Sequence, residues 1–308
     1  ELLLLDRHGS DGGRCAARHH SHGKQRVHRT PKRSARAHKA HDEPYGHRHV
    51  AHRSEPRRRH PVRTEPVLLP LSARKSEAAC GLDCANALED TIKNVTSGHP
   101  AAFIAESIQG NAGIIVPPEG YFQRVKEIIS SYGGLFIADE VQTGFARTGR
   151  MFAIEHAGVT PDIMCVAKAL GNGQPISAFI ASAKVADSYT KPGASTLGGN
   201  PVSSTAGLAV LNYIEEHRLA ENAEARGREL RKGLAEIQKR HPIIGDIRGL
   251  GLMTGAEFVH SDKSPAPEEL DTVLEELKDR GFIVGKNGVA RNVMAFQPPL
   301  IITEENIN

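Results

Sequence analysis

Short apolar segments alternate with helix-like segments between residues 100 and 240, and this alternation constrains the fold more than any other feature. Four segments are short, apolar and strand-like, namely residues 102–106, 135–139, 163–168 and 176–181. Residues 119–132 repeat apolar side chains at helical spacing. Such alternation is typical of a parallel sheet covered by helices. The sequence therefore predicts an α/β fold with a mainly parallel sheet flanked by helices.

The pattern changes after a long helical region at residues 201–240, whose apolar stripes are formed by Leu208, Leu211 and Ile214 and by Leu230, Leu234 and Ile237. Residues 244–258 are rich in glycine and strand-like, and a helix with one apolar face follows. We therefore expect residues 80–240 to be part of a large domain and residues 241–308 to be part of a smaller α+β domain.

The first 79 residues differ in composition from the rest of the chain. Residues 1–60 hold 11 of the 16 histidines and 15 Lys and Arg against 6 Asp and Glu, a net charge of +9. The other residues have 24 Lys and Arg against 30 Asp and Glu, a net charge of −6. The segment lacks helical or strand periodicity, so we expect it to be disordered. The alternative is a basic arm that contacts nucleic-acid phosphates.

Composition also limits the class of protein. No apolar run approaches the roughly 20 residues that a membrane-spanning helix needs. The chain has 4 cysteines, too few for a disulfide framework, which fits a reducing compartment. Cys80 and Cys84 lack the spacing and partner ligands of a zinc site. We therefore expect a cytoplasmic protein with no membrane segment and no metal site.

Two strand-like segments end in reactive side chains. Asp139 follows one apolar run and Lys168 follows another. In open parallel sheets, ligands bind at the carboxyl ends of the strands, so both side chains can face one site. One interpretation is that the two residues form an ion pair. The other is a pyridoxal phosphate site, because this cofactor forms a Schiff base with a lysine and needs an acid beside its ring nitrogen.

Five segments decide between these interpretations, because together they resemble the class III aminotransferases. This fold-type I family contains ornithine, acetylornithine, 4-aminobutyrate and ω-amino-acid transaminases. The segments are AESIQG at 105–110, ADEVQTGFARTG at 138–149, AKALGNG at 167–173, STLGGNP at 195–201 and FQPPLIIT at 296–303. They occur in the family's order and cover about residues 80–308.

The resemblance implies roles for individual residues. Lys168 would form the Schiff base with pyridoxal phosphate and transfer the substrate proton, and Asp139 would hold the ring nitrogen protonated. Gln142 would hydrogen-bond the phenolic oxygen of the ring. Thr196 would reach the cofactor phosphate of a partner subunit, which implies a homodimer with shared sites. Glu106 would lie on the substrate side, although a hydrogen-bonded carboxylate at a strand end is an alternative for it.

One departure from the family concerns the substrate. Many members have an arginine that binds the α-carboxylate where this chain has Ala295, and Arg291 is no obvious substitute. Asn111 stands where the family often has glutamate. Arg147 has no role in this set. We therefore expect an ω-amino or amine donor, or a carboxylate held by another residue.

The family's upstream segments for the cofactor phosphate and for stacking on its ring are absent. Read one base later, residues 65–71 can spell NPYCYRC, and residues 1–14 and 35–46 can spell further family words in family order. We therefore expect residues 1–79 to be an out-of-frame translation and the chain to be a fragment. This polypeptide is then expected to bind pyridoxal phosphate weakly or not at all.

The resemblance predicts transamination between an amino acid or ω-amine donor and a 2-oxo acid. The alternatives are decarboxylase, aminomutase or racemase chemistry on the same scaffold, or a catalytically inactive fragment. The predicted partners are small molecules and a second copy of the chain, and the net negative charge of the folded part argues against nucleic acid.

Overall fold

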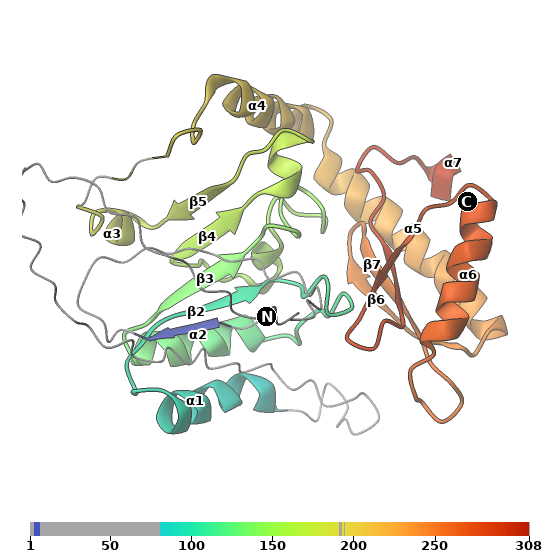
Figure 1. The fold of residues 1–308 in the computed structure, drawn as a ribbon, viewed down its shortest axis with the longest axis horizontal. Helices are drawn as coiled ribbons and strands as arrows, with labels where there is room; N and C mark the ends of the chain where they lie inside the picture. The colour runs from blue at the N-terminus through green and yellow to red at the C-terminus, as the bar shows by residue number, and fades with distance from the viewer. Residues whose placement is uncertain (1–2, 7–80, 191–192, 194, 308) are drawn as a thin grey trace, which may run out of the picture. The chain divides into compact units, whose positions relative to one another are not determined.

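A five-stranded sheet, in the order β1-β2-β3-β4-β5, carries the residues of interest (Figure 1). Its strands are β1 (Leu3–Asp6), β2 (Pro100–Glu106), β3 (Leu135–Asp139), β4 (Ile163–Val166) and β5 (Ala178–Ala181). The computed structural model describes residues 3–6, 81–190, 193 and 195–307. All of these belong to one compact unit. The rest of the segment predicted to be disordered lies outside the described residues.

The sheet is mixed. Strands β2, β3 and β4 are parallel to one another, as predicted, whereas β1 and β5 pair antiparallel with β2 and β4. The chain between β4 and β5 contains only η4 (Lys168–Gly171), a single 3₁₀ turn. A parallel return needs a crossover of a dozen or more residues, usually a helix, so this short connection favours the antiparallel pairing.

Two helices cover one face of this sheet. They are α1 (Asp83–Val95) and α2 (Tyr121–Ser131), which lie side by side in Figure 1. Phe122, Val125 and Ile129, three of the apolar residues that suggested the second helix, are buried there. They pack with alternate residues of β2 and β3, such as Phe103 and Phe136. These strand residues therefore define the α1/α2 face of the sheet, because alternate strand side chains point to the same side.

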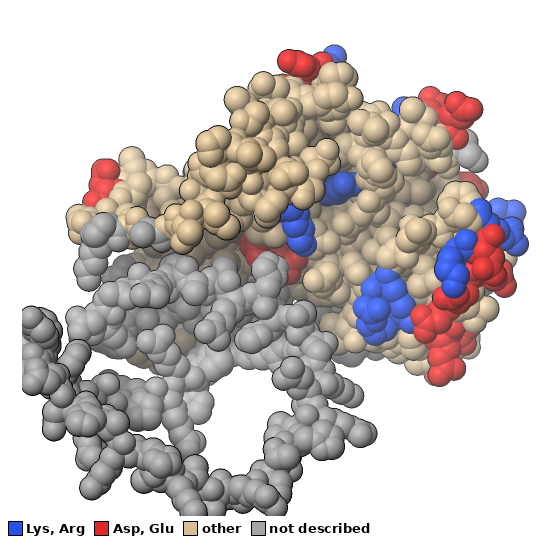
Figure 2. Space-filling model, turned by 45° about the horizontal axis from the view of Figure 1, so that its top comes forward, with Lys and Arg blue, Asp and Glu red and all other residues tan. Residues whose placement is uncertain are grey.

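The long helical region consists of two helices. Helix α4 (Pro201–Glu216) and helix α5 (Leu219–Arg240) are separated at Arg218, whose φ of 49° breaks the helical path. Of the predicted apolar stripes, Ile214 and Leu234 are buried, whereas Leu208 and Ile237 are exposed. Figure 2 shows a largely uncharged surface in the region of α4 and β5. None of the described helices is both long enough and apolar enough to cross a membrane.

The strands that follow residue 243 form a second sheet of four strands. Its order is β6 (Ile244–Leu250), β7 (Met253–Phe258), β9 (Val293–Phe296) and β8 (Gly285–Asn287), and all its pairings are antiparallel. Helix α6 (Pro267–Asp279) packs on it through Leu270, as the apolar spacing indicated. Short elements complete the fold: α3 (Ala183–Ala186), η3 (Ala153–Ala157) and α7 (Glu304–Ile307). The domain limits at 80 and 240 stay predictions.

Candidate functional site

Asp139 and Lys168 lie at the same edge of the five-stranded sheet. Asp139 is the last residue of β3 and pairs with Cys165 on the neighbouring parallel strand β4. Lys168 follows Cys165 by three residues and begins η4. Because the two strands are parallel, both residues come at carboxyl ends, where open α/β sheets bind ligands.

The two residues do not pair with each other. In the described part of the chain, Asp139 Oδ1 accepts a hydrogen bond from the Val141 N–H at 3.0 Å, and no ion pair joins it to Lys168. The Lys168 side chain is exposed. The ion-pair interpretation of these two residues is therefore wrong, and the amine and the carboxylate are both available to a ligand.

The backbone at Lys168 is strained. Its φ is 44°, in the left-handed region, which costs a residue with a Cβ about 1–2 kcal/mol. The following Leu170 and Gly171 are buried, and this turn packs against α4. Strained backbone that the surrounding packing maintains is concentrated at functional sites.

Glu106 lies beside Asp139. The two residues are in register on β2 and β3, so their side chains leave the same face of the sheet. Glu106 Oε2 accepts a hydrogen bond from the Gly110 N–H at 2.8 Å. The structure thus shows the hydrogen bond of a satisfied strand-end carboxylate, and it also places Glu106 next to the acid of the predicted site.

Gln142 links the loop after β3 to the C-terminal segment. Its Nε2 donates to Gln297 Oε1 at 3.3 Å. The side chain packs directly on the backbone of Gly110, where an added Cβ would lie only 2.0 Å from Gln142 Oε1. Three of the five family-like segments therefore meet at Gln142, and a side chain at position 110 would displace the Gln142 amide from this arrangement.

Thr196 stays apart from the other predicted residues. It is exposed and lies just before a turn at Gly198 and Gly199, where Ser195 Oγ accepts a hydrogen bond from the Gly198 N–H at 2.9 Å. Among the described residues it makes no hydrogen bond with Asp139 or Lys168. Its predicted role, in a partner subunit, stays a prediction.

Ala295, which replaces the family's arginine, lies in an apolar environment. It is 7% exposed and packs with Ile108, Ile114 and Met253. Arg291 does not replace the missing charge, because its guanidinium donates to the Lys286 carbonyl oxygen at 2.9 Å. Among the described residues, neither Ala295 nor Arg291 therefore supplies the charge that the family's arginine offers to a carboxylate.

Sequence reasoning missed Glu140, the next residue after Asp139. Its side chain is completely buried, and it accepts hydrogen bonds from four donors. The donors are Ser107 Oγ at 2.7 Å, Thr143 Oγ1 at 2.5 Å, Ala153 N at 3.0 Å and Ile154 N at 2.7 Å. The available signal was the pair of consecutive acids at the end of a buried strand. Consecutive side chains leave opposite faces of a sheet, so one of the two acids had to lie on the buried face.

Arg147 is a second residue that the prediction left without a role. Its guanidinium donates to the carbonyl oxygens of Leu252 at 3.1 Å and Pro298 at 2.6 Å. Burial lowers the pKa of Arg147 to about 10. Its own carbonyl accepts from the Leu252 N–H at 3.0 Å. Arg147 therefore fixes the loop after β3 to the β6–β7 turn and to the PPL segment.

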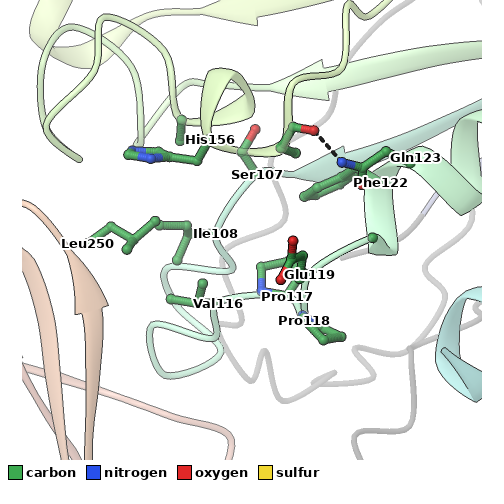
Figure 3. A pocket seen from close by; sticks show the side chains of 13 residues that line it. Ser107, Ile108, Val116, Pro117, Pro118, Glu119, Phe122, Gln123, His156 and Leu250 are labelled. Atoms are coloured by element: carbon green, nitrogen blue, oxygen red, sulfur yellow. Dashed lines mark hydrogen bonds between the residues drawn. The ribbon is translucent and has the colours of Figure 1, made fainter. Parts of the chain in front are cut away.

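A cavity of about 300 Å³ lies next to Glu140 on the α1/α2 face (Figure 3). Ser107, Phe122, His156 and Leu250 are among the residues that line it. Figure 3 shows these residues coming from the end of β2, from α2, from η3 and from the end of β6. The cavity is therefore on the opposite side of the sheet from Asp139 and Glu106.

The residues on the Asp139 side fit the ring end of pyridoxal phosphate. The donor set comprises an exposed amine at Lys168, a carboxylate at Asp139 and an amide at Gln142, and it matches the aldehyde, the ring nitrogen and the phenolic oxygen. Among the described residues, no three His, Cys, Asp or Glu are grouped as metal ligands.

Comparisons with known proteins identify the family of this chain. The family model described as aminotransferase class-III matches residues 51–308. Alanine–glyoxylate aminotransferase 2 homolog 2 of Arabidopsis thaliana, named as mitochondrial, is 44% identical over 71% of this chain and 46% of its own length. Leucine/methionine racemase of Thermococcus litoralis is 43% identical over 76% of this chain and 53% of its own.

A solved aminotransferase structure is also similar to this chain. The ornithine aminotransferase of Toxoplasma gondii matches with a TM-score of 0.64 and 39% identity, over 72% of this chain and 51% of that one. Its description mentions partial occupancy of PLP at the active site. The chain spans about half the length of the curated relatives that it matches.

Proposed function

This chain belongs to the class III aminotransferase family, and from that premise we propose that it forms part of a pyridoxal phosphate-dependent aminotransferase. The proposed reaction moves an amino group from an amino acid or ω-amine donor to a 2-oxo acid. One observation carries the proposal. Asp139 and Lys168 lie at the carboxyl ends of adjacent parallel strands without pairing with each other.

Each side chain then has a defined task. Bound pyridoxal phosphate supplies an electron-withdrawing ring that stabilises negative charge on the carbon bearing the amino group. Lys168 Nζ attaches the cofactor, and it takes and returns the proton of that carbon. The Asp139 carboxylate keeps a proton on the ring nitrogen. Gln142 Nε2 donates to the phenolic oxygen.

Two features of the chain support these assignments. The Asp139 carboxylate is held by the Val141 N–H and is not neutralised by Lys168, so its charge can act on a ring nitrogen. Gln142 is fixed by Gln297 on one side and by the Gly110 backbone on the other, so its amide is preorganised.

The substrate follows from Ala295. An α-carboxylate is best held by a bidentate guanidinium, and position 295 offers a methyl group among apolar side chains instead. We propose that the donor is an ω-amino compound or an amine, with Glu106 on its side of the cofactor. A homodimer in which Thr196 reaches the partner's cofactor phosphate, and a cytoplasmic location, complete the proposal.

A racemase is the second candidate, because a relative with 43% identity is named as a leucine/methionine racemase. Lys168 and Asp139 would serve both reactions. The two are distinguished by incubating the protein with pyridoxal phosphate and either an L-amino acid or an ω-amine, with and without a 2-oxo acid. Appearance of the D-enantiomer without a 2-oxo acid supports the racemase, and amino transfer that requires the 2-oxo acid supports the aminotransferase.

Borohydride trapping tests the cofactor site. The 308-residue chain is incubated with pyridoxal phosphate and reduced, and the modified lysine is identified by peptide mapping. We expect the label at Lys168 and a lower yield there in Asp139→Ala, with Lys184, an exposed lysine, as the internal reference. A label spread over exposed lysines with no preference for Lys168 would contradict the proposal for this chain.

A further inference from the structure

Glu140 is a buried carboxylate whose described hydrogen-bond donors are all neutral. Both of its oxygens are used: Oε1 accepts from Ser107 Oγ and from the Ile154 N–H, and Oε2 accepts from Thr143 Oγ1 and from the Ala153 N–H. Burying a carboxylate is costly unless hydrogen bonds replace its hydration. Four donors from three separate parts of the chain supply that replacement.

The bonding pattern calls for an acceptor oxygen on both sides of the side chain. Each oxygen receives one backbone N–H, which can only donate, so an amide NH₂ in place of either oxygen would face a donor. A glutamine at this position would keep the shape and lose at least one of these hydrogen bonds. The site is thus specific for a side chain with two acceptor oxygens.

The position of Glu140 relates it to the predicted site. Asp139 and Glu106 are in register and leave one face of the sheet. Glu140 and Ser107, the next residue on each strand, leave the other face and are hydrogen-bonded to each other at 2.7 Å. This bond joins the ends of β2 and β3 directly behind the two site carboxylates.

The backbone of Glu140 extends the connection to the third strand. Its N–H donates to the Cys165 carbonyl oxygen on β4 at 2.9 Å, three residues before Lys168. Its carbonyl oxygen accepts from the Gly144 N–H at 3.0 Å, which closes the loop that carries Gln142. Glu140 therefore contacts every segment that supplies a residue to the Asp139 side.

We propose that Glu140 is a positioning residue, which fixes Asp139 and Glu106 from the opposite face of the sheet. It touches neither substrate nor cofactor in this role. Its importance for catalysis rests on the proposed function, whereas its effect on the two carboxylates is a property of the chain itself and can be measured without cofactor.

Hydrogen exchange of four amides tests the proposal. The Ala153 and Ile154 amides bind Glu140 itself, whereas the Val141 amide binds Asp139 and the Gly110 amide binds Glu106. In Glu140→Gln we expect exchange at all four amides to be at least about tenfold faster, since about 1.4 kcal/mol of lost local stability corresponds to a factor of ten.

A matched variant separates positioning from general loss of stability. Val125→Ala removes a fully buried side chain from the same α1/α2 face without touching the strand ends. We expect the ratio of Val141 and Gly110 exchange to that of Phe103, in the middle of β2, to rise in Glu140→Gln and to stay constant in Val125→Ala. An equal rise at all amides in both variants would overturn the proposal, as would acceleration confined to Ala153 and Ile154.

Ser107→Ala provides a second route if Glu140→Gln fails to fold. It removes the bond between the two strands and keeps the carboxylate, so we expect faster exchange at Gly110 and little change at Ile154. Unchanged exchange at Gly110 would contradict the connection through Ser107. Because these measurements use the chain without cofactor, their outcome is separate from that of borohydride trapping. Where cofactor binds, a weaker affinity for pyridoxal phosphate in Glu140→Gln is the additional readout.

Discussion

The two faces of the sheet, at the ends of β2 and β3, differ in how their carboxylates are held. On the α1/α2 face, Glu140 is fully buried and accepts four hydrogen bonds. On the other face, Asp139 is only partly buried and accepts a hydrogen bond from the nearby Val141 N–H, and Lys168, after the adjacent strand, is exposed. Adjacent residues of the same charge thus have opposite environments.

The difference indicates that the adjacent residues Asp139 and Glu140 have separate roles, one in ligand binding and one in structure. A group that must bind a ligand keeps its hydrogen-bonding capacity open, and a group that must hold the structure uses all of it. Glu140 has no capacity left for a ligand. Asp139 and Lys168 contribute little to packing, so their substitution is expected to change function more than stability.

The largest expected effect is that of Glu140→Ala. It leaves two buried backbone N–H groups and two hydroxyls without their acceptor, and we expect the free energy of unfolding to fall by about 3–5 kcal/mol. Urea denaturation followed by circular dichroism measures it. Glu127→Ala, at an exposed position on α2, is the control and should change the value by less than about 0.5 kcal/mol. Equal effects of the two variants would remove the contrast between the faces.

Ser107→Ala is expected to have an intermediate effect. It removes one of the four donors to Glu140, and the other three remain. We expect a loss of about 1–2 kcal/mol in the free energy of unfolding. The double variant Ser107→Ala with Glu140→Ala should lose less than the sum of the two single losses, because both remove the same bond. A strictly additive result would mean that the bond contributes nothing.

Lys168 offers a test on the other face. Its φ of 44° is unfavourable for alanine and favourable for glycine. We expect Lys168→Gly to be more stable than Lys168→Ala by about 1 kcal/mol, and both to lose the borohydride-trapped label at this position. If alanine is the more stable replacement, the left-handed conformation at Lys168 is not maintained in solution.

The smallest effect on stability is expected for Asp139→Asn. The asparagine Oδ1 can still accept from the Val141 N–H, so unfolding should change by no more than about 0.5 kcal/mol. The yield of pyridoxal phosphate trapped at Lys168 by borohydride should fall because the negative charge is lost. A loss of stability comparable to that of Glu140→Ala would show that the two faces are not functionally divided.

Local pattern was sufficient for the central part of the fold. Strands β2 and β3 occur where short apolar runs indicated buried strands, and helices α2 and α6 occur where apolar side chains recur at helical spacing. The pattern was less informative for α4, where Leu208 has the spacing of a core residue and is nevertheless exposed. The direction of β5 also depended on the short connection that precedes it.

The candidate site was predicted in its chemistry and incompletely in its contacts. Asp139 and Glu106 come to one face of the sheet through strand register, Lys168 follows the adjacent strand, and Gln142 lies in the loop after β3. Arg147 was left without a role, because its partners Leu252 and Pro298 are more than 100 residues away in sequence and no local pattern connects them.

The sequence by itself determined which reactive groups end the strands and in what order the family-like segments occur. Both properties can be recognised from neighbouring residues along the chain. Only the tertiary structure decided that Glu140 faces a buried set of donors while Asp139 remains open. Ser107 and the first N–H groups of η3 reach Glu140 only after the chain has returned from 33 and from 13–14 residues away. Hydrogen-bond partners brought together by such returns leave no periodic trace in the sequence.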